Sequence, residues 1–295
     1  MIKIKDIIKK YNLTATRYEK RGKAIIINTK DGAYVCKEGK IDDKILTYLK
    51  SRNFDYMPKL LENSSYQLTR YIEDYKIPDE QKIIDLVKLV SLLHSKTTYY
   101  KEIDLDDFES LYDDLNNNLD YLYGYYTDLI TLIESKVFPS PSQQLLSRNI
   151  SKIYDTISNN KKRLNYWHTL VKEKTKQRNV LLHNNLKLDH FIRNDKSYLI
   201  SWDKAKIDSP VFDIFKLYKN HVLDFDFENI LKTYEYNYPL TKDEKELFYI
   251  LISMPDIIKF DDNEYNMCIK ISHMLDKIYK TEKILPKTLE EGQKE

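Results

Sequence analysis

The sequence has little glycine, little cysteine and almost no net charge, and each shortage excludes a class of protein. Five glycines among 295 residues leave few places for a backbone cradle around phosphate, and neither a Walker A pattern nor GxGxxG is present. The two cysteines, Cys36 and Cys268, do not make a disulfide framework and fit a reducing compartment. A net charge of +2 argues against a nucleic-acid partner, because phosphate backbones select a concentrated basic face.

Long apolar runs are also missing. No segment reaches the roughly 18 apolar residues that a membrane-spanning helix needs, so no membrane partner is expected. The N-terminal MIKIKDIIKKYNL is basic and amphipathic and lacks the continuous apolar stretch of a secretory signal. With 42% hydrophobic and 32% charged residues, the composition is that of a soluble globular protein. The expected location is therefore cytoplasmic.

The first part of the chain has the pattern of a small antiparallel sheet. TATRYEK, KAIIINT and GAYVCKE are short runs rich in β-branched and aromatic residues, and they predict three consecutive strands. The turns between them are predicted at Gly22 and at Asp31 with Gly32. The other elements predicted here are helices over 1–13 and 41–51 and strands over 57–61 and 66–72.

After Pro78 the pattern becomes helical. Apolar residues recur at intervals of three and four over 80–94, and Pro78 precedes the acidic first turn, as is typical of a helix start. Two short apolar runs, 180–191 and 197–202, interrupt the helical part. The further helices are predicted over 108–136, over 145–176, and from about 211 to the end.

These patterns predict an α+β fold with two lobes. A β-rich lobe is expected over 1–75 and a mainly helical lobe over 76–285, followed by a flexible tail over 286–295. A small antiparallel lobe ahead of a large helical lobe that contains one short hairpin is the organisation of protein-kinase-like folds. Such folds place a nucleotide between the lobes.

Several segments carry motifs in the order that a kinase-like chain requires. They are YVCK at the third strand, LVKLVSLLHSKT on the first long helix, then LLHNNLKLDHFI and YLISWDKAKIDSPVFDIFKLY. Together they resemble the aminoglycoside phosphotransferase and choline kinase superfamily, and most of all the bacterial spore-coat kinase-like proteins. The loop of that superfamily reads H-G-D-x-x-x-x-N, followed by I-D-F/W-D/E and D-x-P-x-x-D-L/I. The matching residues are His183, Trp202, Asp203, Asp208, Pro210 and Asp213.

The resemblance covers nearly the whole chain and implies roles for particular residues. Lys37 corresponds to the lysine that contacts phosphate. His183 and Asp213 take structural positions, in which His183 braces the loop and Asp213 caps a helix or ties the loop backbone. No cofactor is certain, and ATP with Mg²⁺ or Mn²⁺ is the one implied if any binds.

Three positions depart from the superfamily pattern, and the resemblance implies that these are the positions for catalysis and metal binding. Asn185 stands at the catalytic Asp position, His190 at the metal-binding Asn position, and Ser201 at the metal-binding Asp position. Asn185 cannot take a proton from a hydroxyl. Ser201 is a weak ligand where Mg²⁺ prefers carboxylate oxygen, and the nitrogen of His190 suits softer metals.

Two interpretations follow. In the first, the chain is a catalytically degenerate kinase-like protein, or pseudokinase, which acts by binding or assembly, with a spore coat as one possible setting. In the second, it is an active ATP-dependent phosphotransferase with a shifted metal site made of Asp189, His190 and Asp203; alternatively, Asp203 is a salt-bridge or turn residue. The partner is an unidentified protein or a small hydroxylated molecule.

Overall fold

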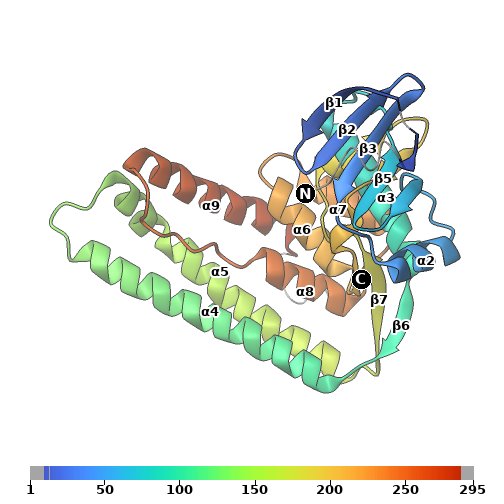
Figure 1. The fold of residues 1–295 in the computed structure, drawn as a ribbon. Coiled ribbons are helices and arrows are strands. Elements are labelled where there is room, and N and C mark those ends of the chain that lie inside the picture. Colours follow the sequence, from blue (N-terminus) through green and yellow to red (C-terminus); the bar gives the residue numbers. More distant parts are fainter. Residues whose placement is uncertain (1–9, 13, 287–295) are drawn as a thin grey trace. The chain divides into compact units, whose positions relative to one another are not determined.

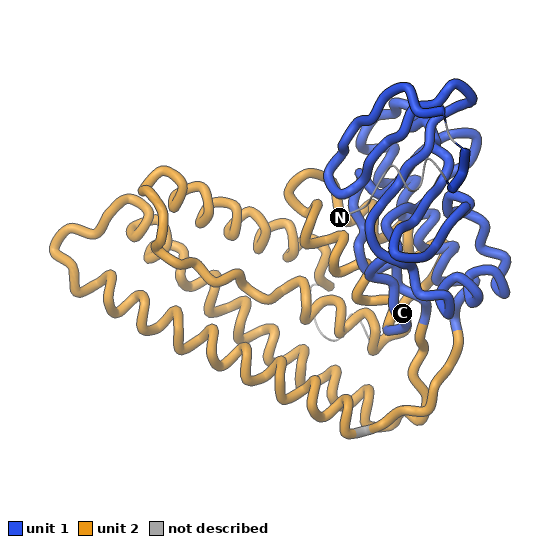
Figure 2. The backbone as a smooth tube through the Cα atoms, in the orientation of Figure 1, with its two compact units in different colours: residues 1–98, 180–208 blue, residues 99–179, 209–295 orange. Residues whose placement is uncertain are grey.

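The computed structural model describes residues 10–12 and 14–286, which form two compact units (Figure 2). Unit 1 extends to Thr98 and takes in Val180–Asp208, and unit 2 comprises Tyr99–Asn179 and the chain from Ser209. The lobe boundary predicted after residue 75 marks the change from strands to helices, and it remains a prediction. The helix predicted over 1–13 and the tail over 286–295 fall almost wholly outside the described residues.

Unit 1 contains a five-stranded antiparallel sheet in the order β1-β2-β3-β5-β4 (Figure 1). Its strands are β1 (Ala15–Arg21), β2 (Ala24–Thr29), β3 (Gly32–Glu38), β4 (Leu60–Asn63) and β5 (Tyr66–Arg70). The predicted three-strand meander is confirmed, and its first turn uses Gly22 at φ +56°, a conformation that glycine adopts without steric cost. One face of the sheet buries Ile27, Cys36 and Leu68 completely.

The fourth strand lies further along the chain than predicted. The pattern predicted a strand over 57–61, whereas β4 begins at Leu60. Pro58 has no N–H to donate to a neighbouring strand, and the pairing with β5 begins two residues after it. The prediction of a strand here was therefore correct, but its predicted bounds were wrong.

The remaining elements of unit 1 include those formed by the motif segments. They are α2 (Asp43–Ser51), α3 (Asp79–Thr97), the single-turn 3₁₀ helices η1 (Leu188–His190) and η2 (Trp202–Lys204), the hairpin of β8 (Phe191–Arg193) and β9 (Ser197–Leu199), and β10 (Lys206–Asp208). The Asp42 carboxylate accepts a hydrogen bond from the Lys44 amide at 2.9 Å and caps α2. Strand β10 pairs with residues 180–182, the end of β7 (Lys176–Leu182). The two predicted apolar runs thus become short strands and turns.

Unit 2 is mainly helical. Its helices are α4 (Leu105–Glu134), α5 (Pro141–Lys172), α6 (Val211–His221), α7 (Phe227–Asn237), α8 (Lys242–Ile252) and α9 (Glu264–Ile284). Helices α4 and α5 form a long antiparallel hairpin, and α5 also packs against α8 and α9 (Figure 1). The residues that α5 buries recur at intervals of three, four and seven from Leu146 to Val171, as one face of a helix requires. None of the described helices has a stretch long and apolar enough to cross a membrane.

Two predictions for this part of the chain were wrong. Helix α5 begins at Pro141, not at residue 145, because proline suits the first helical position and Ser140 forms a capping box with Gln143. The helix predicted to reach residue 176 ends at Lys172. Residues 176–179 instead pair with β6 (Tyr99–Glu102), a strand that the sequence analysis missed.

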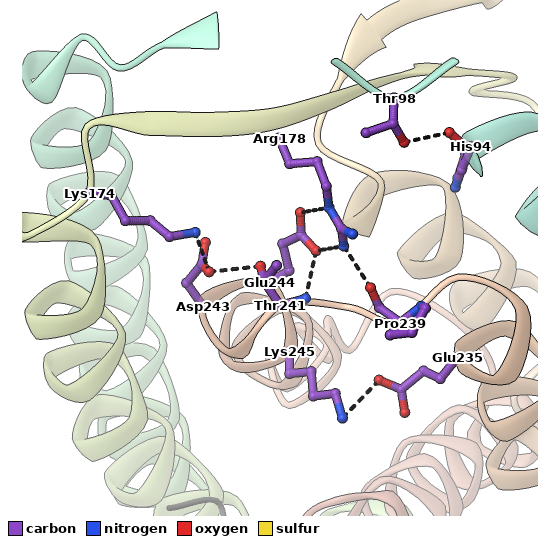
Figure 3. A network of polar contacts seen from close by, with 10 residues as sticks. All are labelled: His94, Thr98, Lys174, Arg178, Glu235, Pro239, Thr241, Asp243, Glu244 and Lys245. Carbon is purple, nitrogen blue, oxygen red and sulfur yellow. Dashed lines mark hydrogen bonds and ion pairs between the residues drawn. The ribbon is translucent and has the colours of Figure 1, made fainter. Parts of the chain in front are cut away.

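A polar network fixes the start of α8 in unit 2 (Figure 3). The Arg178 guanidinium donates from Nε to the Glu244 carboxylate at 3.0 Å, donates from Nη2 to the other carboxylate oxygen, and donates to the Pro239 carbonyl at 2.8 Å. Glu244 also accepts a hydrogen bond from the Thr241 amide at 2.9 Å, which closes the capping box of α8. The ion pairs Lys174–Asp243 and Lys245–Glu235 flank this contact.

Candidate functional site

Most of the predicted site residues lie in unit 1. Lys37 is on β3, Asn185 follows β7, and Asp189 and His190 belong to η1. Ser201 and Asp203 lie at the start of η2. Asp213 is in unit 2, fully buried in the first turn of α6, where a carboxylate stabilises the helix dipole.

The structure joins Lys37 to Asp203. Side chains alternate between the faces of a strand, so Lys37 lies on the face of β3 opposite to the buried Cys36. Its ammonium group donates a hydrogen bond to Asp203 Oδ1 and forms an ion pair with it. The Lys37 side chain is 19% exposed and that of Asp203 is 37% exposed, so water still reaches the carboxylate.

The environment keeps Asp203 ionised. Partial burial acts to raise the pKa of its carboxyl, but the hydrogen bond and the charge of Lys37 outweigh burial, and the pKa is lowered below its ordinary value. At neutral pH the Asp203 carboxylate is therefore ionised and lies against the ammonium group of Lys37. A lysine in this state has one of its three N–H groups committed to a carboxylate rather than to a phosphate.

His183 connects two segments of unit 1, and the bracing role that the resemblance implies for it stays a prediction. It is fully buried, and its Nε2 donates a hydrogen bond to the Ile200 carbonyl at 2.8 Å. Its ring meets Trp202 edge-on, with ring centres 4.8 Å apart. Trp202 is buried and donates from Nε1 to the Leu199 carbonyl at 2.8 Å. These contacts connect the segment after β7 to the segment after β9.

His190 is held by the backbone of Asn185. Its Nδ1 donates to the backbone carbonyl of Asn185 at 2.6 Å, which leaves Nε2 as the nitrogen for any other contact. The His190 backbone carbonyl accepts from the Ile200 amide at 3.0 Å. Both Asn185 and His190 are half-buried, and the His190 side chain is part of the structure of the loop through its hydrogen bond to the Asn185 carbonyl.

The backbone turns sharply at two positions in this loop. Asn184 and Ser201 have φ of +59° and +68°, in the left-handed region that L-residues other than Asn and Asp seldom adopt. The Asn184 side chain donates to the Lys204 carbonyl at 2.8 Å and so ties the two turns together. Asn184 was not singled out in the sequence, although its place beside the motif histidine was a usable signal.

The side chains of Asn185, His190 and Ser201 are not the ligands that Mg²⁺ prefers. They carry an amide, an imidazole and a hydroxyl group, whereas Mg²⁺ prefers an octahedron of oxygen ligands with carboxylates among them. Across residues 10–12 and 14–286, no three His, Cys, Asp or Glu side chains are grouped so that they could hold a metal ion. The shifted set of Asp189, His190 and Asp203 stays a prediction.

Comparisons with known proteins identify the fold. No family model and no curated protein matches the sequence. An aminoglycoside phosphotransferase from Alicyclobacillus acidocaldarius matches in structure with a TM-score of 0.68 at 11% identity, over 96% of this chain and 95% of that one. A spectinomycin phosphotransferase bound to AMP matches with a TM-score of 0.52 at 12% identity, over 97% and 96% of the two chains.

A choline kinase from Streptococcus pneumoniae is a more distant match, with a TM-score of 0.48 at 15% identity over 94% of this chain and 97% of that one. At such identities the likeness to the two phosphotransferases establishes the fold alone. Their matches extend over both units of the chain. The chain therefore has the kinase-like fold of these two phosphotransferases.

Proposed function

We propose that this chain is a catalytically degenerate phosphotransferase-fold protein that acts by binding. The observation that carries the proposal is the Lys37–Asp203 ion pair. The Asp203 carboxylate lies close to the substituted position Ser201 in the sequence, and it is bound to Lys37, the lysine expected to contact phosphate. Lys37 and Asp203 therefore neutralise each other, and binding a phosphate or a metal ion there requires the pair to be broken.

The three substitutions support the same proposal. Loss of a general base typically costs about 10²–10⁴-fold in rate, and Asn185 has no basic group to replace it. Without a well-bound metal ion, the charge on a transferring phosphoryl group is poorly neutralised, and this electrostatic contribution is usually the largest. The losses need not add, because residues that act as a unit are non-additive.

The proposed role is binding or assembly with a protein partner. The motif resemblance to spore-coat kinase-like proteins makes assembly in a spore coat one form of this role, and a cytoplasmic location is the other setting proposed. A small hydroxylated molecule is the alternative partner.

One observation favours an active phosphotransferase instead. The Asp203 carboxylate is 37% exposed and ionised, so a divalent cation that displaces Lys37 would find a charged oxygen ligand. Release of Lys37 would at the same time free its ammonium group for phosphate. In this alternative the Lys37–Asp203 ion pair is present only in the ligand-free site, and binding of ATP with Mg²⁺ or Mn²⁺ breaks it.

Thermal unfolding with ATP, with and without Mg²⁺ or Mn²⁺, separates the two functions, because a ligand that binds the native state raises the melting temperature. The variants are wild type and Asp203→Asn, with Asp43→Asn as the matched control. Asp43 forms an ion pair with Lys40 in the same unit, and both side chains are largely exposed. The degenerate protein is expected to show no metal-dependent shift in any of the three.

Transfer of labelled γ-phosphate to a panel of alcohols completes the test. A metal-dependent shift together with transfer, both lost in Asp203→Asn and kept in Asp43→Asn, would refute the degenerate function and establish the alternative. A shift by ATP alone that grows in Asp203→Asn would instead show that freeing Lys37 creates an anion site without catalysis.

A further inference from the structure

The loop that joins α4 to α5 exposes large apolar side chains at the end of the helical hairpin of unit 2 (Figure 1). Val137 is 84% exposed and Phe138 is 91% exposed, and Leu132 in the last turn of α4 is 60% exposed. Apolar residues that are exposed singly are normal on a protein surface, whereas a group of them points to an interaction site. We refer to Val137 and Phe138 as the hairpin tip.

The residues that follow the tip hold it in one conformation. The Gln144 side chain donates from Nε2 to the Pro139 carbonyl at 3.2 Å, and the capping box at Ser140 fixes the start of α5. The Ser142 amide donates to the Glu264 carboxylate at the start of α9. A segment that is already ordered loses less conformational entropy when it binds, so the tip is suited to insertion into a partner.

Unit 2 also contains a hollow of suitable size, which we refer to as the α6–α9 hollow. It lies between the end of α6, the middle of α9 and the segment that precedes α9, and its volume is about 520 Å³. A cavity of about 150 Å³ can hold benzene, so this hollow has room for both side chains of the tip. Leu223 and Ile257 in its lining are 37% and 39% exposed, so an incoming side chain can reach them. The other apolar residues of the lining are Val222, Ile258 and Met274.

Many of the charges around the α6–α9 hollow compensate one another, in the ion pairs Lys270–Asp261 and Lys277–Asp256. Lys219 lies over the Phe215 ring, 5.7 Å from its centre. Lys259 has no charged partner in the part of the chain that the structure describes. Asp224 has only His221, at 3.3 Å, and its side chain is 60% exposed. The hollow therefore offers an uncompensated lysine and a weakly paired aspartate beside an apolar surface.

The residues beside the tip carry charges that complement these. Glu134 and Lys136 lie just before the tip, both are exposed, and neither side chain has a partner among residues 10–12 and 14–286. A partner surface that presents both a lysine and an aspartate matches this arrangement. An anionic membrane does not match it, because α4 carries many acidic residues and no basic residue and a negative surface potential repels it.

The tip of a chain does not enter the hollow of the same chain. The hydrogen bond between Ser142 and Glu264 places the loop beside the start of α9. The part of α9 that lines the hollow begins at Lys270, which at 1.5 Å per residue lies roughly 9 Å further along the helix. The tip side chains are largely exposed, so none of the described residues covers them. An occupant of the hollow with the features of the tip must therefore come from another molecule.

We propose that the hairpin tip of one copy of this chain inserts into the α6–α9 hollow of a second copy. The apolar side chains of the tip lie against Leu223 and Ile257, and the flanking Lys136 pairs with Asp224. A contact between two different surfaces closes into a dimer when it is made in both directions and continues as a filament when it is not. All of these residues belong to unit 2. The contact does not depend on whether the candidate site in unit 1 is active, so either inference can fail alone.

Sedimentation velocity of the full chain across a concentration series tests the proposal. The average mass of wild type is expected to rise with concentration. Phe138→Ser is expected to weaken this association by about ten- to hundredfold, because the burial of one large apolar side chain is lost. Tyr236→Ser is the matched control and is expected to associate like wild type. Tyr236 is 89% exposed on α7 and lies outside the tip and the hollow.

Two variants that are each defective at one surface identify the contact. Phe138→Ser keeps the hollow, and Ile257→Glu keeps the tip. Each variant alone is expected to be mostly monomeric at concentrations where wild type associates. Mixed together, they are expected to form one-to-one complexes, because the intact tip of one can enter the intact hollow of the other. The melting temperature of each variant shows that it is folded.

A photo-crosslinking amino acid at position 138 shows where the tip lies in the complex, and we expect crosslinks between copies at Leu223 and Ile257. The proposal is wrong if wild type stays monomeric throughout the series, if Phe138→Ser associates like wild type, or if the two variants do not associate when mixed. Crosslinks between copies that form only outside the hollow would also overturn it. Binding of monomeric wild type to anionic lipid vesicles, lost in Phe138→Ser, would show instead that the tip contacts a membrane.

Discussion

Replacing Glu244 by glutamine removes the charge that faces Arg178 and keeps a side chain of the same size. The two side chains are only 11% and 6% exposed, and the Nε–Oε1 distance is 3.0 Å. Two unit charges at that separation attract by about 5 kcal/mol at an effective dielectric constant of 20. Part of this attraction offsets the cost of burying both charges, and removing one partner leaves the other uncompensated.

We expect Glu244→Gln to lower the free energy of unfolding of unit 2 by about 3–5 kcal/mol. The loss is electrostatic, because glutamine can still accept the Thr241 amide in the capping box. The double variant Arg178→Met, Glu244→Gln is expected to lose much less than the sum of the two single variants. Methionine can pack on the Tyr238 ring, which lies 4.4 Å from the Arg178 guanidinium carbon.

The assay is urea unfolding followed by tryptophan fluorescence. A chain with two compact units can unfold in more than one step, so the probe must report unit 2 alone. The two tryptophans are Trp167, buried on α5 in unit 2, and Trp202, in unit 1. A Trp202→Phe background therefore leaves Trp167 as the sole reporter, and each variant is made in that background.

The control is Lys245→Met, which breaks the neighbouring ion pair with Glu235. Those side chains are 34% and 24% exposed, and such solvated pairs contribute at most about 1 kcal/mol. If Glu244→Gln costs no more than Lys245→Met, or if the single losses simply add in the double variant, burial is not what sets the strength of the Arg178–Glu244 contact.

Three further predictions concern unit 1 and the cysteines. Hydrogen bonds from Lys10 and Tyr11 lower the pKa of Glu62 to about 2. The stability that this carboxylate contributes is therefore present above its ordinary pKa and is lost as the pH falls towards 2. Across that pH range the melting temperature of Glu62→Gln should fall less steeply than that of wild type. Burial raises the pKa of the Cys36 thiol to about 11, so in a thiol-titration assay the half-buried Cys268 should react first, and equal rates would contradict this. The triple variant Asn185→Asp, His190→Asn, Ser201→Asp should show a Mg²⁺-dependent rise in melting temperature with ATP. None of the three single variants should show this rise.

The strands and helices with strong periodicity were predictable from sequence. The β-branched runs gave the meander of β1, β2 and β3, and the three-and-four spacing gave α3, because burial on one face leaves that signal in the order of residues. Strand β6 left no such signal. Its sequence YYKE pairs with KQRN, and most of these side chains are not buried, so no hydrophobic alternation marks them.

The sequence predicted where the candidate site residues lie along the chain, and it did not predict their contacts. Lys37 lies on β3, as the strand pattern predicted, and the roles that the resemblance implies for the site residues stay predictions. The ion pair between Lys37 and Asp203 joins residues 166 positions apart, and no local pattern encodes which acid a strand lysine meets. Lys37 lies on β3 and its carboxylate partner lies on η2, far along the chain.

Several contacts that hold the loop do not involve the side chains of Asn185, His190 or Ser201. His183, Trp202 and the carbonyls of Leu199 and Ile200 hold it through buried rings and hydrogen bonds, so catalytic side chains can change while these contacts remain. The replacement His190 has gained a structural contact of its own, since its Nδ1 donates to the Asn185 carbonyl. A neutral hydrogen bond of this kind contributes about 1 kcal/mol. Replacing His190 by asparagine would therefore introduce an amide oxygen that a metal ion can use and would remove a hydrogen bond that holds the present loop, so we expect this variant to be less stable than wild type by about 1 kcal/mol.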